Sequence, residues 1–261
     1  MKLACQENLV PGKSLEEKLY RLEKYGYAGI EFWGGNIKSR AEEIRRLCEQ
    51  SKVKPSTICA GFRGSPLDAD KGQRDLAMAD IKELLEVAGY IGAIGVIVVP
   101  IFGQPKVPDL SPWKTAREIE FELLVKLLKD IAPHAERANS ILLIEPLNRY
   151  ETHFLRKLED AVSVVKEVAS PNIQIMADFF HMSIEEVNIV KSIEAAGQYI
   201  QHIHLADSTR LLPGYGHTDF EAGFTALKKI GFRNYMALEC VVPGDPDLEL
   251  PKCAEYLRKF I

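Results

Sequence analysis

Short apolar runs alternate with longer amphipathic stretches along the whole chain, and this alternation limits the fold more than any other feature. The apolar runs, each of strand length, lie at residues 2–5, 29–33, 54–60, 93–100, 141–145, 173–178, 200–206 and 235–240. The stretches with helical spacing lie at residues 14–25, 39–51, 70–91, 115–138, 158–169, 184–197, 218–230 and 248–260. Strands that each lead into a helix in this way predict an α/β fold, a single (β/α)8 TIM barrel over residues 1–261.

A doubly wound open sheet is the competing arrangement for such a pattern. That fold binds its ligands with a glycine-rich loop directly after the first strand, and no such fingerprint follows residues 2–5. A length of 261 residues suits one barrel, and no linker-like tract divides the chain. The barrel is therefore the favoured architecture.

Composition and charge restrict the class of protein. Hydrophobic residues make up 46% of the chain and charged residues 27%, as in a soluble globular protein, and the net charge of −4 argues against a nucleic-acid partner. The five cysteines form no C-x-x-C pair, which favours reduced thiols and a cytoplasmic location. The chain shows no signal-peptide pattern and no run of roughly 18 apolar residues, so no membrane association is expected.

Four successive apolar runs in the C-terminal half carry a metal-binding type of residue at or near their ends. These residues are Glu145, Asp178, His204 and Glu239. In a barrel the active site lies at the carboxyl ends of the strands, so the four side chains are expected to converge at one mouth. Carboxylates brought together in a poorly solvated pocket repel one another unless a cation lies between them.

Three oxygen ligands and one imidazole form a set that suits Mn²⁺, Mg²⁺, Co²⁺ or Zn²⁺. We therefore predict a site for one divalent metal ion, with Mn²⁺ the favoured cofactor. His202 lies two residues before His204, on the same face of the strand but one layer deeper. It is interpreted as a hydrogen-bonded core histidine and not as a ligand.

Four segments together resemble the xylose isomerase-like superfamily of TIM-barrel sugar isomerases and epimerases. They are IEPLNRYETHF (144–154), ADFFHMSIEE (177–186), HIHLADSTRLLPGYGHTDF (202–220) and ALEC (237–240). Within that superfamily the pattern is most similar to ketose 3-epimerases of the D-tagatose/D-psicose (allulose) type. The resemblance implies a metal-dependent isomerase that epimerises C3 of a ketose through a cis-enediolate, and it implies the same four metal ligands.

The resemblance also implies roles for individual residues. Glu145 and Glu239 become the acid/base pair, and Glu151, His181 and Arg210 become substrate contacts. Each contact has a structural alternative: Arg210 pairs with Asp207 or Glu239, His181 caps a helix, or Glu151 is an exposed loop residue. Trp33, at the end of the second apolar run, is expected from its position to line the sugar pocket.

The expected partner is a small-molecule sugar or sugar phosphate, and the family resemblance implies a homodimer or homotetramer. Two departures from the epimerase pattern, Arg156-Lys157 and Ser208-Thr209, leave the substrate open. The cations at 156 and 157, with the loop at 213–217, raise the alternative of a phosphorylated or acidic substrate. Hydroxypyruvate isomerases, aldose–ketose isomerases and inosose-converting enzymes of the same superfamily remain alternatives.

Two other classes of protein share the barrel. A DNA repair nuclease of the endonuclease IV type needs extra histidines at the ends of early strands, and the runs at 29–33, 54–60 and 93–100 supply none. A metal-free sugar-binding or regulatory barrel would not need all four candidate ligands. Both alternatives are therefore disfavoured against an enzyme.

Overall fold

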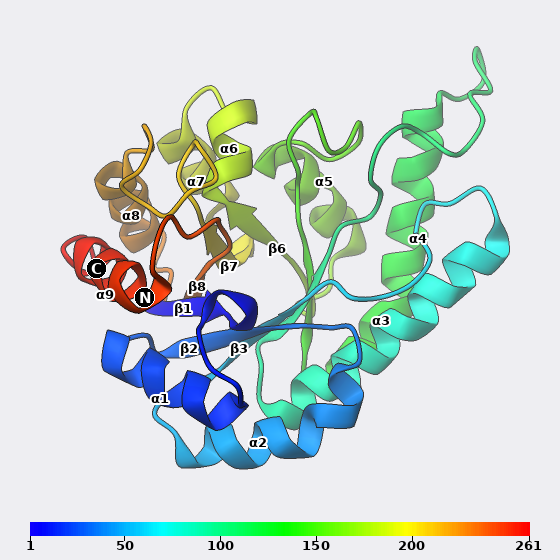
Figure 1. The fold of residues 1–261 in the computed structure, drawn as a ribbon. Helices are drawn as coiled ribbons and strands as arrows, with labels where there is room; N and C mark the ends of the chain where they lie inside the picture. The colour runs from blue at the N-terminus through cyan, green and yellow to red at the C-terminus, as the bar shows by residue number, and fades with distance from the viewer.

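The eight apolar runs form parallel strands that close into a barrel, with β8 beside β1 (Figure 1). The computed structural model describes residues 1–261, and it confirms the predicted fold class. The strands are β1 (Lys2–Gln6), β2 (Gly29–Trp33), β3 (Lys54–Cys59), β4 (Gly95–Val98), β5 (Ile141–Ile144), β6 (Ile173–Asp178), β7 (Ile200–Leu205) and β8 (Tyr235–Leu238).

Helices surround the barrel and cover its outer face (Figure 1). The α-helices are α1 (Leu15–Tyr25), α2 (Ala41–Gln50), α3 (Lys71–Ile91), α4 (Ala116–Arg137), α5 (Leu158–Val168), α6 (Phe179–Glu185), α7 (Ile189–Ala196), α8 (Phe220–Lys229) and α9 (Pro246–Arg258). Short 3-10 helices, η1 (Glu7–Leu9), η2 (Ile37–Arg40) and η3 (Gly197–Tyr199), complete the structure. None of the helices combines the length and apolar character needed to cross a membrane.

One predicted helix, at 184–197, is replaced by the two shorter helices α6 and α7. The side chain of Asp178 accepts hydrogen bonds from the backbone N–H groups of Phe180 and His181, so α6 begins directly after β6. Glu186 then adopts extended backbone, and Asn188 caps α7. The early helix start brings His181 back toward the strand ends.

Two apolar layers hold the barrel together, one outside the sheet and one inside. A cluster of 64 buried residues fills the space between the strands and the helices. Inside the barrel, Cys59, Ile97, Leu143 and Met176 form a small separate cluster. Leu143 thus lies two residues before Glu145 on the inward face of its strand, as the strand periodicity predicted.

The opposite end of the barrel is closed by Tyr235, which packs with Ala4 and Ala237. Gly29 is the first residue of β2, which lies beside β1. It leaves room for the Tyr235 ring, because a Cβ atom at position 29 would lie 2.6 Å from Tyr235 Cδ1. The packing of the Tyr235 ring inside the barrel therefore depends on glycine at position 29.

Replacing Gly29 by alanine is expected to lower the free energy of unfolding by about 1–3 kcal/mol, because the new methyl group overpacks the barrel interior. Gly72→Ala, in the first turn of α3, is the control, since its nearest neighbour is the flexible Asp70 carboxylate at 3.3 Å. Urea unfolding of both variants measures the difference. Equal urea midpoints for Gly29→Ala and Gly72→Ala would show that Tyr235 moves aside with no loss of stability.

Candidate active site

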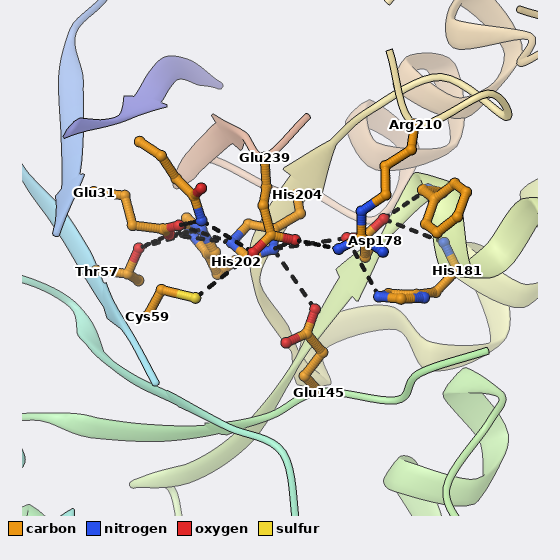
Figure 2. Close-up of polar contacts among 12 residues, drawn as sticks. Glu31, Thr57, Cys59, Glu145, Asp178, His181, His202, His204, Arg210 and Glu239 are labelled. Carbon is orange, nitrogen blue, oxygen red and sulfur yellow. Dashed lines mark hydrogen bonds and ion pairs between the residues drawn. The ribbon is translucent and has the colours of Figure 1, made fainter. Parts of the chain in front are cut away.

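The four predicted metal ligands meet at the carboxyl ends of β5–β8 (Figure 2). One ligand atom from each of Glu145, Asp178, His204 and Glu239 lies within 4.8 Å of the others. His204 Nδ1 is 3.6 Å from Glu145 Oε1, 3.7 Å from Asp178 Oδ2 and 3.3 Å from Glu239 Oε2. We call these four residues the acidic centre. The imidazole nitrogen thus faces three carboxylates at similar distances.

The acidic centre contains buried polar atoms without hydrogen-bond partners. They are Glu145 Oε1, Asp178 Oδ2 and His204 Nδ1, all directed at the same point. Unpaired buried polar atoms are rare because each costs about 1–3 kcal/mol. A divalent cation would bind all three, and this oxygen-rich donor set with one imidazole suits such an ion. The residues present therefore fit a metal site.

Burial and neighbouring charges set the protonation of these groups. Burial opposes the charged form of His204, but the carboxylates of Glu31 and Glu239 outweigh it and raise the pKa of the ring well above its ordinary value. Burial raises the pKa of Glu145. Burial also opposes ionisation of Asp178, yet the charges of His181 and His204 lower the pKa of this carboxyl. A cation or a proton is thus needed to balance the negative charge of the carboxylates in the acidic centre.

Glu31 is a part of the site that the sequence analysis missed. It is fully buried in β2, and its two oxygens lie 3.0 and 3.2 Å from His204 Nε2. Because a carboxylate only accepts, Nε2 carries the ring proton and the lone pair of neutral His204 is left on Nδ1, toward the acidic centre. Burial disfavours a charged Glu31, but the nearby His204 and hydrogen bonds from both histidines lower its pKa well below the usual range.

Three further side chains contact Glu31, and Figure 2 shows Glu31 with two of them, Thr57 and His202, beside the acidic centre. His202 Nε2 lies 2.9 Å from Glu31 Oε2, the Thr57 hydroxyl donates to the same oxygen, and Gln6 Nε2 donates to Glu31 Oε1 at 3.0 Å. The interpretation of His202 as a buried, hydrogen-bonded core histidine is confirmed. A signal for Glu31 was available, since a charged residue inside the apolar run GIEFW needs a buried partner.

His181 lies beside the acidic centre, buried in the first turn of α6. Its Nδ1 accepts from the backbone N–H of Asn148 at 3.2 Å and from Asn148 Nδ2 at 2.8 Å. Nε2 of the neutral ring therefore carries the proton, and it lies 3.9 Å from Asp178 Oδ2. The cap of α6 is Asp178, so the alternative of His181 as a helix cap is wrong.

Arg210 joins two predicted site residues. It forms ion pairs with Glu151 Oε1 at 3.0 Å and with Glu239 Oε2 at 3.4 Å, and its guanidinium lies 4.6 Å from the centre of the Phe180 ring. Its backbone has φ of +58°, a conformation that is costly for a residue other than glycine. Glu151 lies in a loop but is half-buried and also accepts from Asn148 Nδ2, so the alternative of an exposed loop residue is wrong.

Other polar residues of the same segments have structural roles. Arg149 pairs with Glu185 at 2.7 Å, and His153 pairs with the buried Glu120 at 2.7 Å. Trp33 ends β2 with 63% of its surface exposed, on the side of the mouth opposite the Glu151 and His181 segments.

The loop at 213–217, after β7, already binds a carboxylate of the protein itself, that of Asp207. Asp207 accepts from the backbone N–H groups of Ser208, Gly214 and Thr218, which holds its pKa below the usual value against burial. These N–H groups are thus not free to bind a phosphate. Arg156 is exposed, and Lys157 pairs with Glu159, so neither cation joins the acidic centre.

Several known proteins that resemble the chain are sugar epimerases. It is 27% identical to the 3-dehydro-D-guloside 4-epimerase of Escherichia coli K12 over 241 residues, 92% of each chain. A crystal structure of 3-keto-D-glucoside 4-epimerase, YcjR, from E. coli superimposes with a TM-score of 0.91 at 26% identity, over 99% of both chains. The D-psicose 3-epimerase of Enterocloster bolteae is 36% identical over 115 residues, 44% of this chain and 38% of that relative.

These relatives confirm the predicted enzyme class, isomerase, and the predicted resemblance to ketose 3-epimerases. The model of the xylose isomerase-like TIM barrel family matches residues 19–260, nearly the whole chain. With the closed parallel barrel, this match shows that the chain belongs to the xylose isomerase-like TIM barrel family.

Proposed function

We propose that the protein is a divalent-metal-dependent epimerase of keto sugars that inverts the carbon next to the ketone. The observation that carries this proposal is the position of Glu145 and Glu239, which reach His204 Nδ1 from two different strand ends at 3.6 and 3.3 Å. Inversion requires one carboxylate on each face of the reacting carbon, because a single acid/base group tends to return the proton to the face it left.

The acidic centre supplies the binding site for the metal, with Glu145, Asp178, His204 and Glu239 as ligands and Mn²⁺ as the favoured ion. When bound, a divalent ion polarises the ketone and lowers the pKa of the neighbouring C–H. Burial raises the pKa of Glu145, which is the direction that suits a carboxylate that takes up a proton during the reaction. Gln6 Nε2, at 3.0 Å, and Arg210 hold the Glu239 carboxylate in place.

The remaining predicted contacts orient the sugar. His181 Nε2–H is placed to donate to a sugar oxygen, since Asn148 occupies the other ring nitrogen. Glu151 and Arg210 form an ion pair that offers both an acceptor and donors to hydroxyl groups. Positioning of this kind contributes to catalysis because it removes the entropy cost of aligning the reacting carbon with both carboxylates.

The epimerised carbon is C3 in a free 2-ketose and C4 in a 3-keto glycoside. C3 of a ketose is the position that the sequence motifs favour. C4 is the second candidate, supported by the near full-length match to a 3-dehydro-D-guloside 4-epimerase. The occupied loop after β7 favours a neutral sugar over a sugar phosphate. In either sugar the proton removed lies beside the ketone, so the same residues serve both reactions.

Substitution of either glutamate is expected to slow epimerisation strongly while leaving part of the proton exchange. In D₂O, metal-loaded Glu145→Gln should exchange the C–H proton of one epimer and Glu239→Gln that of the other, each with inversion slowed about 10²–10⁴-fold. Proton NMR of a keto-sugar panel, with metal content measured in parallel, gives the result. Glu159→Gln, on the exposed face of α5, is the control. No exchange by the wild-type enzyme on any keto sugar would contradict the proposal.

Loss of the Glu31 charge is expected to weaken metal binding about 10–100-fold, because Glu31 fixes the His204 tautomer. Competition with a chromophoric chelator measures the affinity of Glu31→Gln. Glu120→Gln is a matched control, since Glu120 is also buried and also pairs with a histidine, yet lies outside the acidic centre. Equal weakening in both variants would assign the effect to general destabilisation.

Metal affinity is expected to rise with pH. The pKa of His204 lies well above its ordinary value, so near neutrality the metal-free ring holds a proton that the ion must displace from Nδ1. Each unit of pH increase below that pKa then strengthens binding by up to about tenfold. Calorimetry in buffers of different ionisation enthalpy should detect about one proton released per ion at pH 7. Binding without proton release would refute this protonation state.

A further inference from the structure

A cavity of about 440 Å³ opens beside the acidic centre, at the ends of β1, β2 and β3. It is lined by Gln6, Glu7, Asn8, Lys18, Glu31, Trp33, Arg40 and Cys59. Two of the lining side chains contact the proposed acid/base residue Glu239: Gln6 Nε2 lies 3.0 Å and Cys59 Sγ 3.8 Å from its Oε1. Its volume falls within the usual range of small-molecule pockets, and none of the proposed sugar contacts from β5–β7 lines it.

Trp33 is the main apolar surface of this cavity. It lies two residues after Glu31 on the inward face of β2, so it stands one layer above the group that contacts His204. The indole packs against Gly35, where a Cβ atom would lie 2.8 Å from Trp33 Nε1. With 63% of its surface exposed, the ring offers a flat face that a planar or ring-shaped ligand can cover.

The charges around the cavity are paired with one another. Glu7 accepts from both terminal nitrogens of Arg40, at 3.0 and 2.6 Å, and Lys18 Nζ donates to the Glu7 carbonyl at 3.0 Å. Lys18 Nζ also lies 3.9 Å from Glu7 Oε1, so this one carboxylate faces both cations. The ionic groups of the wall thus contact one another, while Trp33 supplies an uncharged face for a neutral ring.

We propose that this cavity is the subsite for the substituent on the anomeric carbon of a keto glycoside, a neutral ring that stacks on Trp33. This inference rests on the second candidate of the proposed function, a 3-keto glycoside, since it takes the keto-sugar ring to lie at the acidic centre between Glu151, His181 and Arg210. A substituent on that ring reaches the β1–β3 side of the mouth, whereas a free ketose leaves Trp33 uncovered. The preferred substrates are therefore glycosides with a ring-shaped aglycone.

Comparison of three substrates tests the subsite. The probes are 4-nitrophenyl 3-keto-β-D-glucoside, methyl 3-keto-β-D-glucoside and D-fructose, with exchange of the proton beside the ketone followed in D₂O. We expect kcat/KM to be about tenfold higher for the aryl than for the methyl glycoside, and Trp33→Ala to remove this ratio. Trp113→Ala, an exposed tryptophan of the loop after β4, should preserve it. An unchanged ratio in Trp33→Ala would overturn the proposal.

Binding can be tested without catalysis, because Trp33 and Trp113 are the only tryptophans. In Trp113→Phe the fluorescence comes from Trp33 alone, and the unoxidised 4-nitrophenyl β-D-glucoside should quench it saturably. The converse variant, Trp33→Phe, should show no saturable quenching. Saturable quenching in both variants, or in neither, would refute the subsite. Saturable quenching with no proton exchange on any keto sugar would instead refute the proposed function.

Discussion

The ion pair between Glu31 and His204 is the contact on which the active-site face depends. Both side chains are fully buried, so each would be costly alone, and they are stable only because they hydrogen-bond to each other and to Thr57, Gln6 and His202. The pair directs Nδ1 of His204 to the three carboxylates that follow β5, β6 and β8. Without Glu31, His204 would be free to adopt the other tautomer or to rotate.

The topology of the barrel brings distant residues to the same depth. Asp178 pairs in register with His204, and His204 pairs with Ala237, two residues before Glu239. The inward direction of each ligand follows from the two-residue period of the strands, with apolar interior side chains such as Leu143 and Met176 beneath them. The acidic centre is therefore a consequence of strand register, and small movements of one strand would separate its ligands.

The C-terminal half of the site was open to prediction because each ligand lies at or near the end of an apolar run, and the motifs around Glu145, Asp178 and His204 resemble a known family. Glu31 was not predicted, because a charged residue inside the run GIEFW signals a buried partner without identifying it, and that partner lies 173 residues away. The start of α6 was also missed, because the capping role of Asp178 was hidden by its role as a candidate ligand. A local pattern can show that a buried charge needs a partner, but it does not show which distant residue is the partner or that one side chain has two roles.

All four residues of the acidic centre come from the last four strands, while the cavity with Trp33 is built by the first three. On the proposed function and subsite, the two halves of the barrel divide proton transfer from recognition of the aglycone, and Glu31, Gln6 and Cys59 contact residues of the acidic centre directly. Evolution, or an engineer, can vary the loops after β1–β3 to change the sugars accepted while the proton-transfer residues stay in place. A barrel organised in this way can diversify its substrates without rebuilding its chemistry.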